Sequence, residues 1–126
     1  MKSFLAAMEK SLPGTQPVEL GVQAFSAGLL FATAAKKAGP DLTRDKLIAT
    51  LKEIHAWDGG GLHGPADVGA KKPAFCFVMM KVADGAFSRV YPLADKDKDV
   101  YENEYREGMA CPKDALLTYA NPPQSP

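Results

Sequence analysis

The stretch LGVQAFSAGLLFATAA, residues 20–35, decides how the rest of the chain is interpreted. It is the longest run without a charged side chain, and it is 16 residues long. A membrane-spanning helix needs about 20 mostly apolar residues, and this shorter run also contains Gln23, Ser26 and Thr33. The run therefore predicts a buried helix of a globular protein rather than a membrane span.

The helix that contains this run is predicted to extend from about Val18 to Lys37. Its large apolar side chains alternate with alanine and glycine, so it is apolar almost all round and neighbours can approach it closely. Lys36 and Lys37 complement the negative end of the helix dipole, and Gly39-Pro40 ends the helix. A helix without a polar face belongs inside a structure larger than itself.

Two shorter helices are predicted on either side of it. The first runs from about Phe4 until the Pro13-Gly14 pair ends it. The other begins after Asp41 or Thr43, either of which can cap it, and fades at about His55. Its apolar stripe has the helical spacing of a buried face, and consists of Leu47, Ile48, Leu51 and Ile54.

The second half of the chain has a different character. Residues 57–73 are rich in glycine and are predicted to form a loop with turns. Phe75–Val82 is apolar at both parities until Lys81, which is typical of a strand covered on both faces. Asp84-Gly85 predicts a tight turn, and Phe87–Tyr91 predicts the return strand. Such an apolar hairpin is not expected to stand in water by itself.

The charges of the chain exclude some classes of function. Lys and Arg together number 15, as do Asp and Glu, so the formal net charge is zero. A nucleic-acid binder usually carries a basic excess, and a polybasic membrane-surface protein carries one too. The run DKDKD at residues 95–99 alternates in sign and predicts a solvated turn. No export signal is expected, because the apolar residues 4–8 are too few.

Candidate catalytic and metal-binding residues gather in one segment. His55, Asp58 and His63 have a spacing that matches no common ligand pattern, and the glycines among them would make a loose site. Both histidines are therefore expected to be surface loop residues. Gly59–Gly61 is not expected to cradle phosphate, because it follows a helix and precedes a hairpin. No nucleophile, base and orienting group can be named from spacing, so the sequence does not favour an enzyme.

The remaining candidates are two cysteines and two aromatic residues. Cys76 and Cys111 could both be buried thiols, or a disulfide could join the tail to the hairpin, and the residues alone leave this open. Trp57 and Phe87 could line a pocket, although packing in a core is the commoner role of such side chains.

Four motifs occur in a fixed order: AAKKAG at residues 34–39, DLTRDKL at 41–47, GGLHGP at 60–65 and VADGAF at 82–87. Over about residues 1–91 the chain resembles the C-terminal part of the Leu/Ile/Val-like (branched-chain amino-acid type) periplasmic solute-binding proteins of ABC importers. The resemblance implies an α/β fold, the C-terminal portion of a type I periplasmic-binding-protein fold with helices followed by a terminal β-hairpin. Members of that family have two lobes and far longer chains, so this chain is expected to be incomplete as a stand-alone lobe.

The resemblance also implies an organisation of the chain as a single partial domain, residues 1–126. Residues 1–56 resemble the helical cover of the N-terminal lobe. Residues 57–92, with the glycine-rich loop and the hairpin, resemble strands of the hinge and the C-terminal lobe. Residues 93–126 form the charged and proline-rich tail.

Few site residues can be carried over from the family. Leu20 falls near a position that touches the ligand, where a leucine adds only apolar contact, and Phe25 stands where the family usually has a tyrosine. Because the family is exported to an oxidising compartment, the resemblance favours a Cys76–Cys111 disulfide. It implies no catalytic residue, no metal and no cofactor.

The function implied by the resemblance is that of a fragment of an ABC transporter's solute-binding component. It would capture an amino acid or a related small organic solute between two lobes and deliver it to the permease, in the periplasm or cell envelope. The alternative is a small self-associating interaction module that binds no solute and covers its apolar faces by forming a homodimer. A third hypothesis, a metal-dependent enzyme that uses His55 and His63, predicts a bound metal ion.

Overall fold

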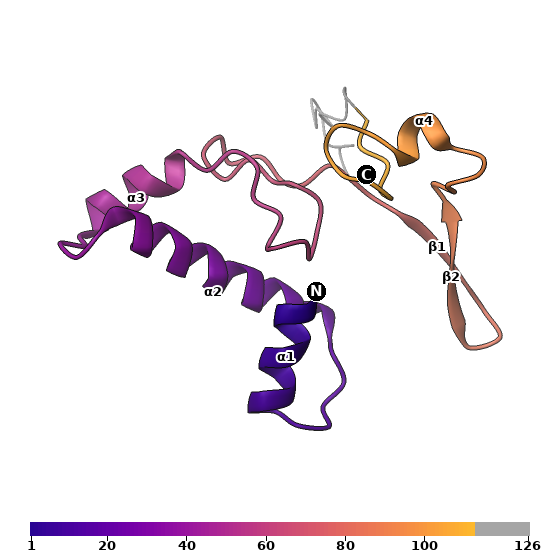
Figure 1. Ribbon diagram of the computed structural model, residues 1–126, viewed down its shortest axis with the longest axis horizontal. Helices are drawn as coiled ribbons and strands as arrows, with labels where there is room; N and C mark the ends of the chain where they lie inside the picture. Colours follow the sequence, from indigo (N-terminus) through magenta and orange to yellow (C-terminus); the bar gives the residue numbers. More distant parts are fainter. Residues whose placement is uncertain (113–126) are drawn as a thin grey trace, which may run out of the picture. The chain divides into compact units, whose positions relative to one another are not determined.

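A computed structural model describes residues 1–112 of the chain. The chain forms two compact units, of which the first is Met1–Ala74 and the second begins at Phe75. Figure 1 shows that the first unit holds three helices and a long loop, and that the second holds the hairpin and a short helix. The mixture of helices with a small two-stranded sheet fits an α/β fragment.

The first unit contains the three helices that the sequence predicts. They are α1 (Lys2–Ser11), α2 (Glu19–Ala38) and α3 (Arg44–Lys52). Of the two capping residues proposed for α3, Thr43 is the N-cap, and its hydroxyl accepts a hydrogen bond from the Lys46 N–H at 3.2 Å. Helix α2 ends at Gly39, which has a φ of 88° and whose N–H donates to the Ala35 carbonyl. This left-handed conformation suits glycine, which lacks a Cβ.

The helices pack on α2 from two sides. Figure 1 shows α3 folded back beside α2 and α1 at the N-terminal end of α2. Ala34 of α2 is completely buried, and Lys37 pairs with Glu53 just after α3 at 2.7 Å. At the other end the rings of Phe4 and Phe25 meet edge to face with centroids 5.4 Å apart. The unit is therefore built around α2.

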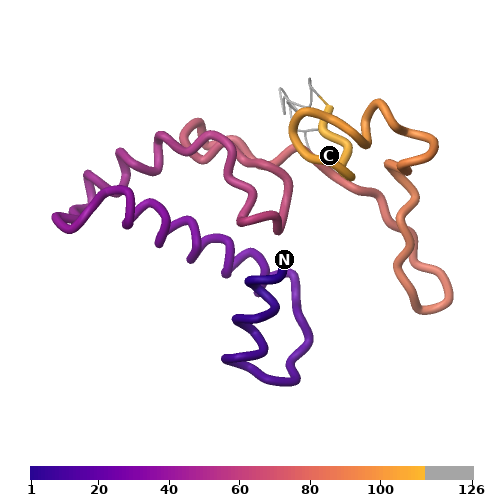
Figure 2. Tube along the Cα trace, viewed as in Figure 1, coloured from indigo at the N-terminus to yellow at the C-terminus, as the bar shows by residue number. Residues whose placement is uncertain are grey.

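The chain between α3 and the second unit returns along α2, as the tube in Figure 2 shows. The glycine-rich loop, defined here as residues 57–66, is closed at its neck by two backbone hydrogen bonds between Trp57 and Ala66, of 2.9 and 2.8 Å. A second turn follows, closed by the bridge between Asp67 and Lys72. The predicted loop is thus confirmed, but it is an ordered one.

The second unit contains the predicted hairpin, formed by β1 (Met79–Ala83) and β2 (Ala86–Tyr91). Asp84 and Gly85 connect the strands with φ values of 52° and 73°. Two positive φ values are the mark of the type I′ turn that suits a right-handed strand twist. The turn that the sequence predicts is therefore present.

Two details of the predicted hairpin are wrong. The first strand begins at Met79 and not at Phe75, because Phe77 pairs instead with Ala110 in an isolated bridge. The strands are also not covered on both faces, since every residue of β1 is exposed and Phe87 of β2 is 76% exposed.

The chain after the hairpin folds back on it. Pro92 follows β2 through a cis peptide bond and is fully buried. The charged run at residues 95–99, predicted as a turn, is half turn and half the start of α4 (Lys98–Tyr101). Arg89 of β2 donates to the Gly108 carbonyl at 2.6 Å and lies over the Tyr101 ring.

The buried core of the described residues is small. Its hydrophobic members, each less than 9% exposed, are Phe4, Ala34, Ala110 and Cys111. Among residues 1–112, no helix has the length and apolar character that crossing a membrane requires.

Candidate functional site

The most elaborate polar arrangement of the first unit is centred on Ser26, in the middle of α2. Ser26 is only 5% exposed, although it lies within the most apolar stretch of the chain. Trp57 donates its indole N–H to the Ser26 hydroxyl at 3.0 Å, and His63 Nε2 lies 2.8 Å from the same oxygen. Both partners belong to the glycine-rich loop.

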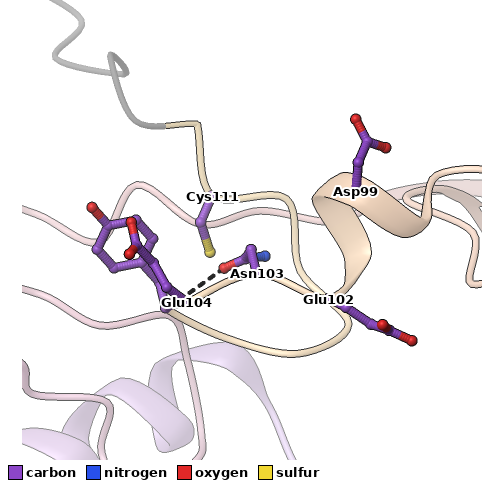
Figure 3. A pocket seen from close by; sticks show the side chains of 6 residues that line it. Asp99, Glu102, Asn103, Glu104 and Cys111 are labelled. Carbon is purple, nitrogen blue, oxygen red and sulfur yellow. Dashed lines mark hydrogen bonds between the residues drawn. The ribbon is translucent and has the colours of Figure 1, made fainter.

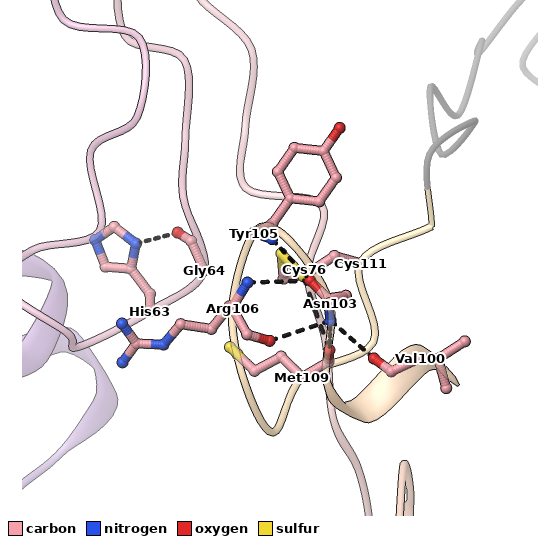
Figure 4. Close-up of a disulfide and its surroundings, with 9 residues drawn as sticks. All are labelled: His63, Gly64, Cys76, Val100, Asn103, Tyr105, Arg106, Met109 and Cys111. Carbon is pink, nitrogen blue, oxygen red and sulfur yellow. Dashed lines mark hydrogen bonds between the residues drawn. A yellow bond between two sulfur atoms is a disulfide. The ribbon is translucent and has the colours of Figure 1, made fainter. Parts of the chain in front are cut away.

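The direction of each hydrogen bond follows from what each group is able to donate. His63 Nδ1 lies 2.7 Å from the Gly64 carbonyl, drawn as a dashed line in Figure 4. A carbonyl can only accept, so Nδ1 carries the proton. In the neutral ring Nε2 is then an acceptor, and the Ser26 hydroxyl donates to it while accepting from Trp57. Every polar atom in this arrangement has a partner.

The glycines of the loop let it approach α2 closely. Gly59, Gly60 and Gly61 have φ values of 66°, 71° and 87°. A Cβ on Gly59 would lie only 2.6 Å from the Ser26 oxygen. All three glycines thus provide a positive φ, and Gly59 also permits a close approach to α2.

Ser26 and His63 have the spacing of a nucleophile and its base, with the Gly64 carbonyl as the orienting group. The sequence does not indicate this pair, because its members are 37 residues apart in no periodic pattern. The hydroxyl is nevertheless covered by Gly59 and already accepts the indole proton donor. The two hydrogen bonds to Ser26 thus join the loop to the helix.

The structure separates the three residues that the sequence grouped as a possible metal or catalytic set. His63 is half-buried against Ser26, so its expected place at the surface is wrong. His55 is exposed and donates from Nδ1 to an Asp67 carboxylate oxygen at 2.8 Å. Asp58 belongs to the loop itself, where its carboxylate accepts from the Gly60 N–H. Among residues 1–112, no three His, Cys, Asp or Glu side chains are grouped to hold a metal ion.

The fold lowers the pKa of the Asp67 carboxyl, which lies just after the glycine-rich loop. Its carboxylate accepts the Ala70 N–H at 2.8 Å and also bonds to His55. The Ala70 hydrogen bond and, to a smaller extent, His55 hold the pKa of Asp67 below its ordinary value. On the helical side of the unit, Lys37 lowers the pKa of Glu53 in the same way.

Leu20, which the resemblance places near a ligand, lies in the first turn of α2 and is 76% exposed. It shares one face of the helix with Ala24, Ala27 and Phe31, and all four are exposed. Phe25 lies on another side, where it packs on Phe4. The exposed face of α2, defined by these four residues, is an uncharged surface with a large side chain near each end.

In the second unit a disulfide joins Cys76 to Cys111, as the resemblance favoured. Figure 4 shows the side chain of Asn103 next to it. The Asn103 amide nitrogen donates to the carbonyls of Val100, Arg106 and Met109, and its oxygen accepts from two backbone N–H groups. This one side chain and the disulfide thus fix the segment that follows α4.

Beside Asn103 lies a hollow of about 240 Å³, shown in Figure 3. Half of its lining residues are acidic, and the lining consists of Asp99, Glu102, Asn103, Glu104, Tyr105 and Cys111. The Tyr105 ring packs edge to face on Phe75.

Trp57 and Phe87, the two aromatic residues considered for a pocket, have different surroundings. Trp57 is half-buried and bonded to Ser26, whereas Phe87 is exposed next to the hairpin turn. Neither lines the acidic hollow.

A comparison with protein families gives one match. The family model described as periplasmic binding protein matches residues 1–86, which is more than half of the 126 residues. No curated protein and no solved structure matches the chain.

Proposed function

The chain belongs to the periplasmic binding protein family, and on this basis we propose that it is part of a solute-binding protein of an ABC importer. The solute would be an amino acid or a related small organic molecule. The match includes α1, α2, α3 and β1, and it ends at Ala86, the first residue of β2. Proteins of this family generally bind solutes and work with permeases, and they are generally not enzymes.

The proposed mechanism is capture of the solute between two lobes, followed by closure and delivery to a permease. A solute favours the closed form only by making better contacts in that form than in the open one. The disulfide between Cys76 and Cys111 agrees with a periplasmic location, where such bonds persist.

The observation that carries the proposal, besides the family match, is the large apolar surface that the described residues leave uncovered. Leu20 is 76% exposed and Phe31 is 55% exposed on the exposed face of α2. Val82 and Phe87 of the hairpin are 66% and 76% exposed. Large apolar side chains that gather on one exposed face often mark a surface that another part of a protein covers. We infer that the other parts of a two-lobed protein cover these faces, and that one end of the exposed face, Leu20, adds apolar contact to the solute.

Because this proposal assigns most of the solute site to polypeptide outside this chain, the 126-residue chain alone should bind solute poorly. Isothermal titration with a panel of amino acids is expected to show no binding tighter than about millimolar. A monomer of this chain that binds one amino acid at micromolar concentration would contradict the proposal.

A self-associating module is the second candidate, favoured by the same exposed side chains. Light scattering after gel filtration separates the two. A compact homodimer with a cooperative melt would favour the module, whereas the solute-binding proposal expects no stable dimer and a weakly cooperative melt.

A further inference from the structure

We propose that the glycine-rich loop, residues 57–66, is held on α2 by the hydrogen bonds of Trp57 and His63 to the Ser26 hydroxyl, and that it moves away from the helix as one unit when they break. These two hydrogen bonds are called the clasp. This inference does not depend on the solute or on the importer. It rests on three features of the loop: a neck that is closed independently of α2, a pair of side chains that meet on one oxygen, and glycines that permit the closed position.

The neck and the interior of the loop are held by their own backbone. Trp57 and Ala66 exchange two hydrogen bonds of 2.9 and 2.8 Å. The N–H groups of Leu62 and His63 both donate to the Asp58 carbonyl, at 3.0 and 3.2 Å. None of these bonds uses an atom of α2, so the loop is able to keep its shape when it leaves the helix.

The two side chains that reach the Ser26 oxygen come from the two arms of the loop. Trp57 precedes the three glycines and His63 follows them. Trp57 supplies only a donor and His63 Nε2 supplies an acceptor, while a hydroxyl is both at once. Loss of this one oxygen therefore leaves both side chains without their partner, which is costly in a half-buried place.

The closed position also requires glycine at position 59. Its Cα lies against Ser26, where a Cβ would come within 2.6 Å of the hydroxyl oxygen. The same clash would push the whole loop outward, because the neck binds the arms together. A variant of Ser26 on the helix, which removes the hydrogen bonds, and a variant of Gly59 in the loop, which introduces the clash, should therefore both open the clasp.

Trp57 is the sole tryptophan of the chain, so its fluorescence reports the clasp directly. In the full 126-residue chain, Ser26→Ala is expected to shift Trp57 emission to longer wavelength and to increase quenching by acrylamide. We expect the open population to rise roughly 10- to 100-fold, from two lost partners. Hydrogen exchange at the Trp57 and Ala66 amides should change little, because the neck stays closed. Ser88→Ala, at an exposed serine of β2, is the matched control and should leave the emission unchanged.

Two further variants keep the test independent of the stability of α2. His63→Ala removes one of the two side chains that bond to Ser26 and leaves the helix sequence intact. Gly59→Ala displaces the loop through the clash between the new Cβ and Ser26. Both should shift Trp57 emission in the same direction as Ser26→Ala, with unchanged helical circular dichroism. Unchanged emission in all three variants would overturn the clasp. Loss of neck protection together with the emission shift would overturn the movement as one unit.

Discussion

A buried hydroxyl in an apolar helix needs hydrogen-bond partners, and Ser26 obtains two from a segment that follows it by more than thirty residues. In the second unit the side chain of Asn103 has a similar role, because it hydrogen-bonds to three backbone carbonyls and two backbone N–H groups. In both places the fold of a loop depends on one polar side chain. The described residues have few large buried apolar side chains that could hold these loops instead.

Asp67 gives a test of stability at the scale of one residue. Its pKa is lowered in the folded chain, first by the Ala70 N–H and then by His55. A lowered pKa means that the carboxylate contributes stability above the unfolded pKa, near 4, and loses it as the pH falls through the folded value. Asp67→Asn should therefore flatten the acid side of a plot of thermal midpoint against pH. Asp41→Asn, at an exposed aspartate before α3, is the control. Superimposable acid limbs for wild type and Asp67→Asn would contradict this assignment.

At the scale of the element, local sequence signals predicted the helices and the hairpin turn well. The uncharged run at residues 20–35 lies wholly inside α2, and Asp84-Gly85 forms the turn as expected. These signals are local, since helical spacing and turn residues act over a few positions. The first strand starts later than predicted because Phe77 is engaged by Ala110, which is distant in sequence.

The candidate site was harder to predict for the same reason. Trp57 and His63 are each candidates by residue type, but nothing in the sequence indicates that both reach Ser26. A contact between residues 37 positions apart produces no periodic pattern in the sequence. In the sequence Ser26 also resembles the other small residues of the apolar helix. The residues alone leave open whether Cys76 and Cys111 are free thiols or form a disulfide. The disulfide is favoured only because the family that the chain resembles is exported to an oxidising compartment.

The disulfide provides a test at the scale of the second unit. It closes a segment of 35 residues that contains both strands and α4. From the chain entropy of such a loop, Cys76→Ser with Cys111→Ser should lower the stability of this unit by about 3 to 4 kcal/mol. Hydrogen exchange at the Phe77 and Ala110 amides, which form the neighbouring bridge, should become faster. The reduced wild-type chain is the matched control. Equal protection in oxidised and reduced chains would show that the bridge does not need the disulfide.

At the scale of the whole molecule, the family match and the uncovered apolar faces lead to one account. The family model matches residues 1–86, which contain α1, α2, α3 and β1, and large apolar side chains of α2 and of the hairpin are exposed. Apolar surface removed from water contributes about 25 cal/mol per Å². If these faces pack on other parts of a two-lobed protein, as we propose, their burial would add to its stability.

The most direct test of this account is solute binding by a chimera. The chain replaces the corresponding C-terminal part of a complete amino-acid-binding member of the family, and isothermal titration measures affinity for that member's own ligand. If this chain is part of a solute-binding protein, the chimera binds the ligand and the host truncated at the junction does not. Leu20→Asp in the chimera is then expected to weaken binding. A chimera that binds no better than the truncated host would contradict the claim that this chain is part of a solute-binding protein.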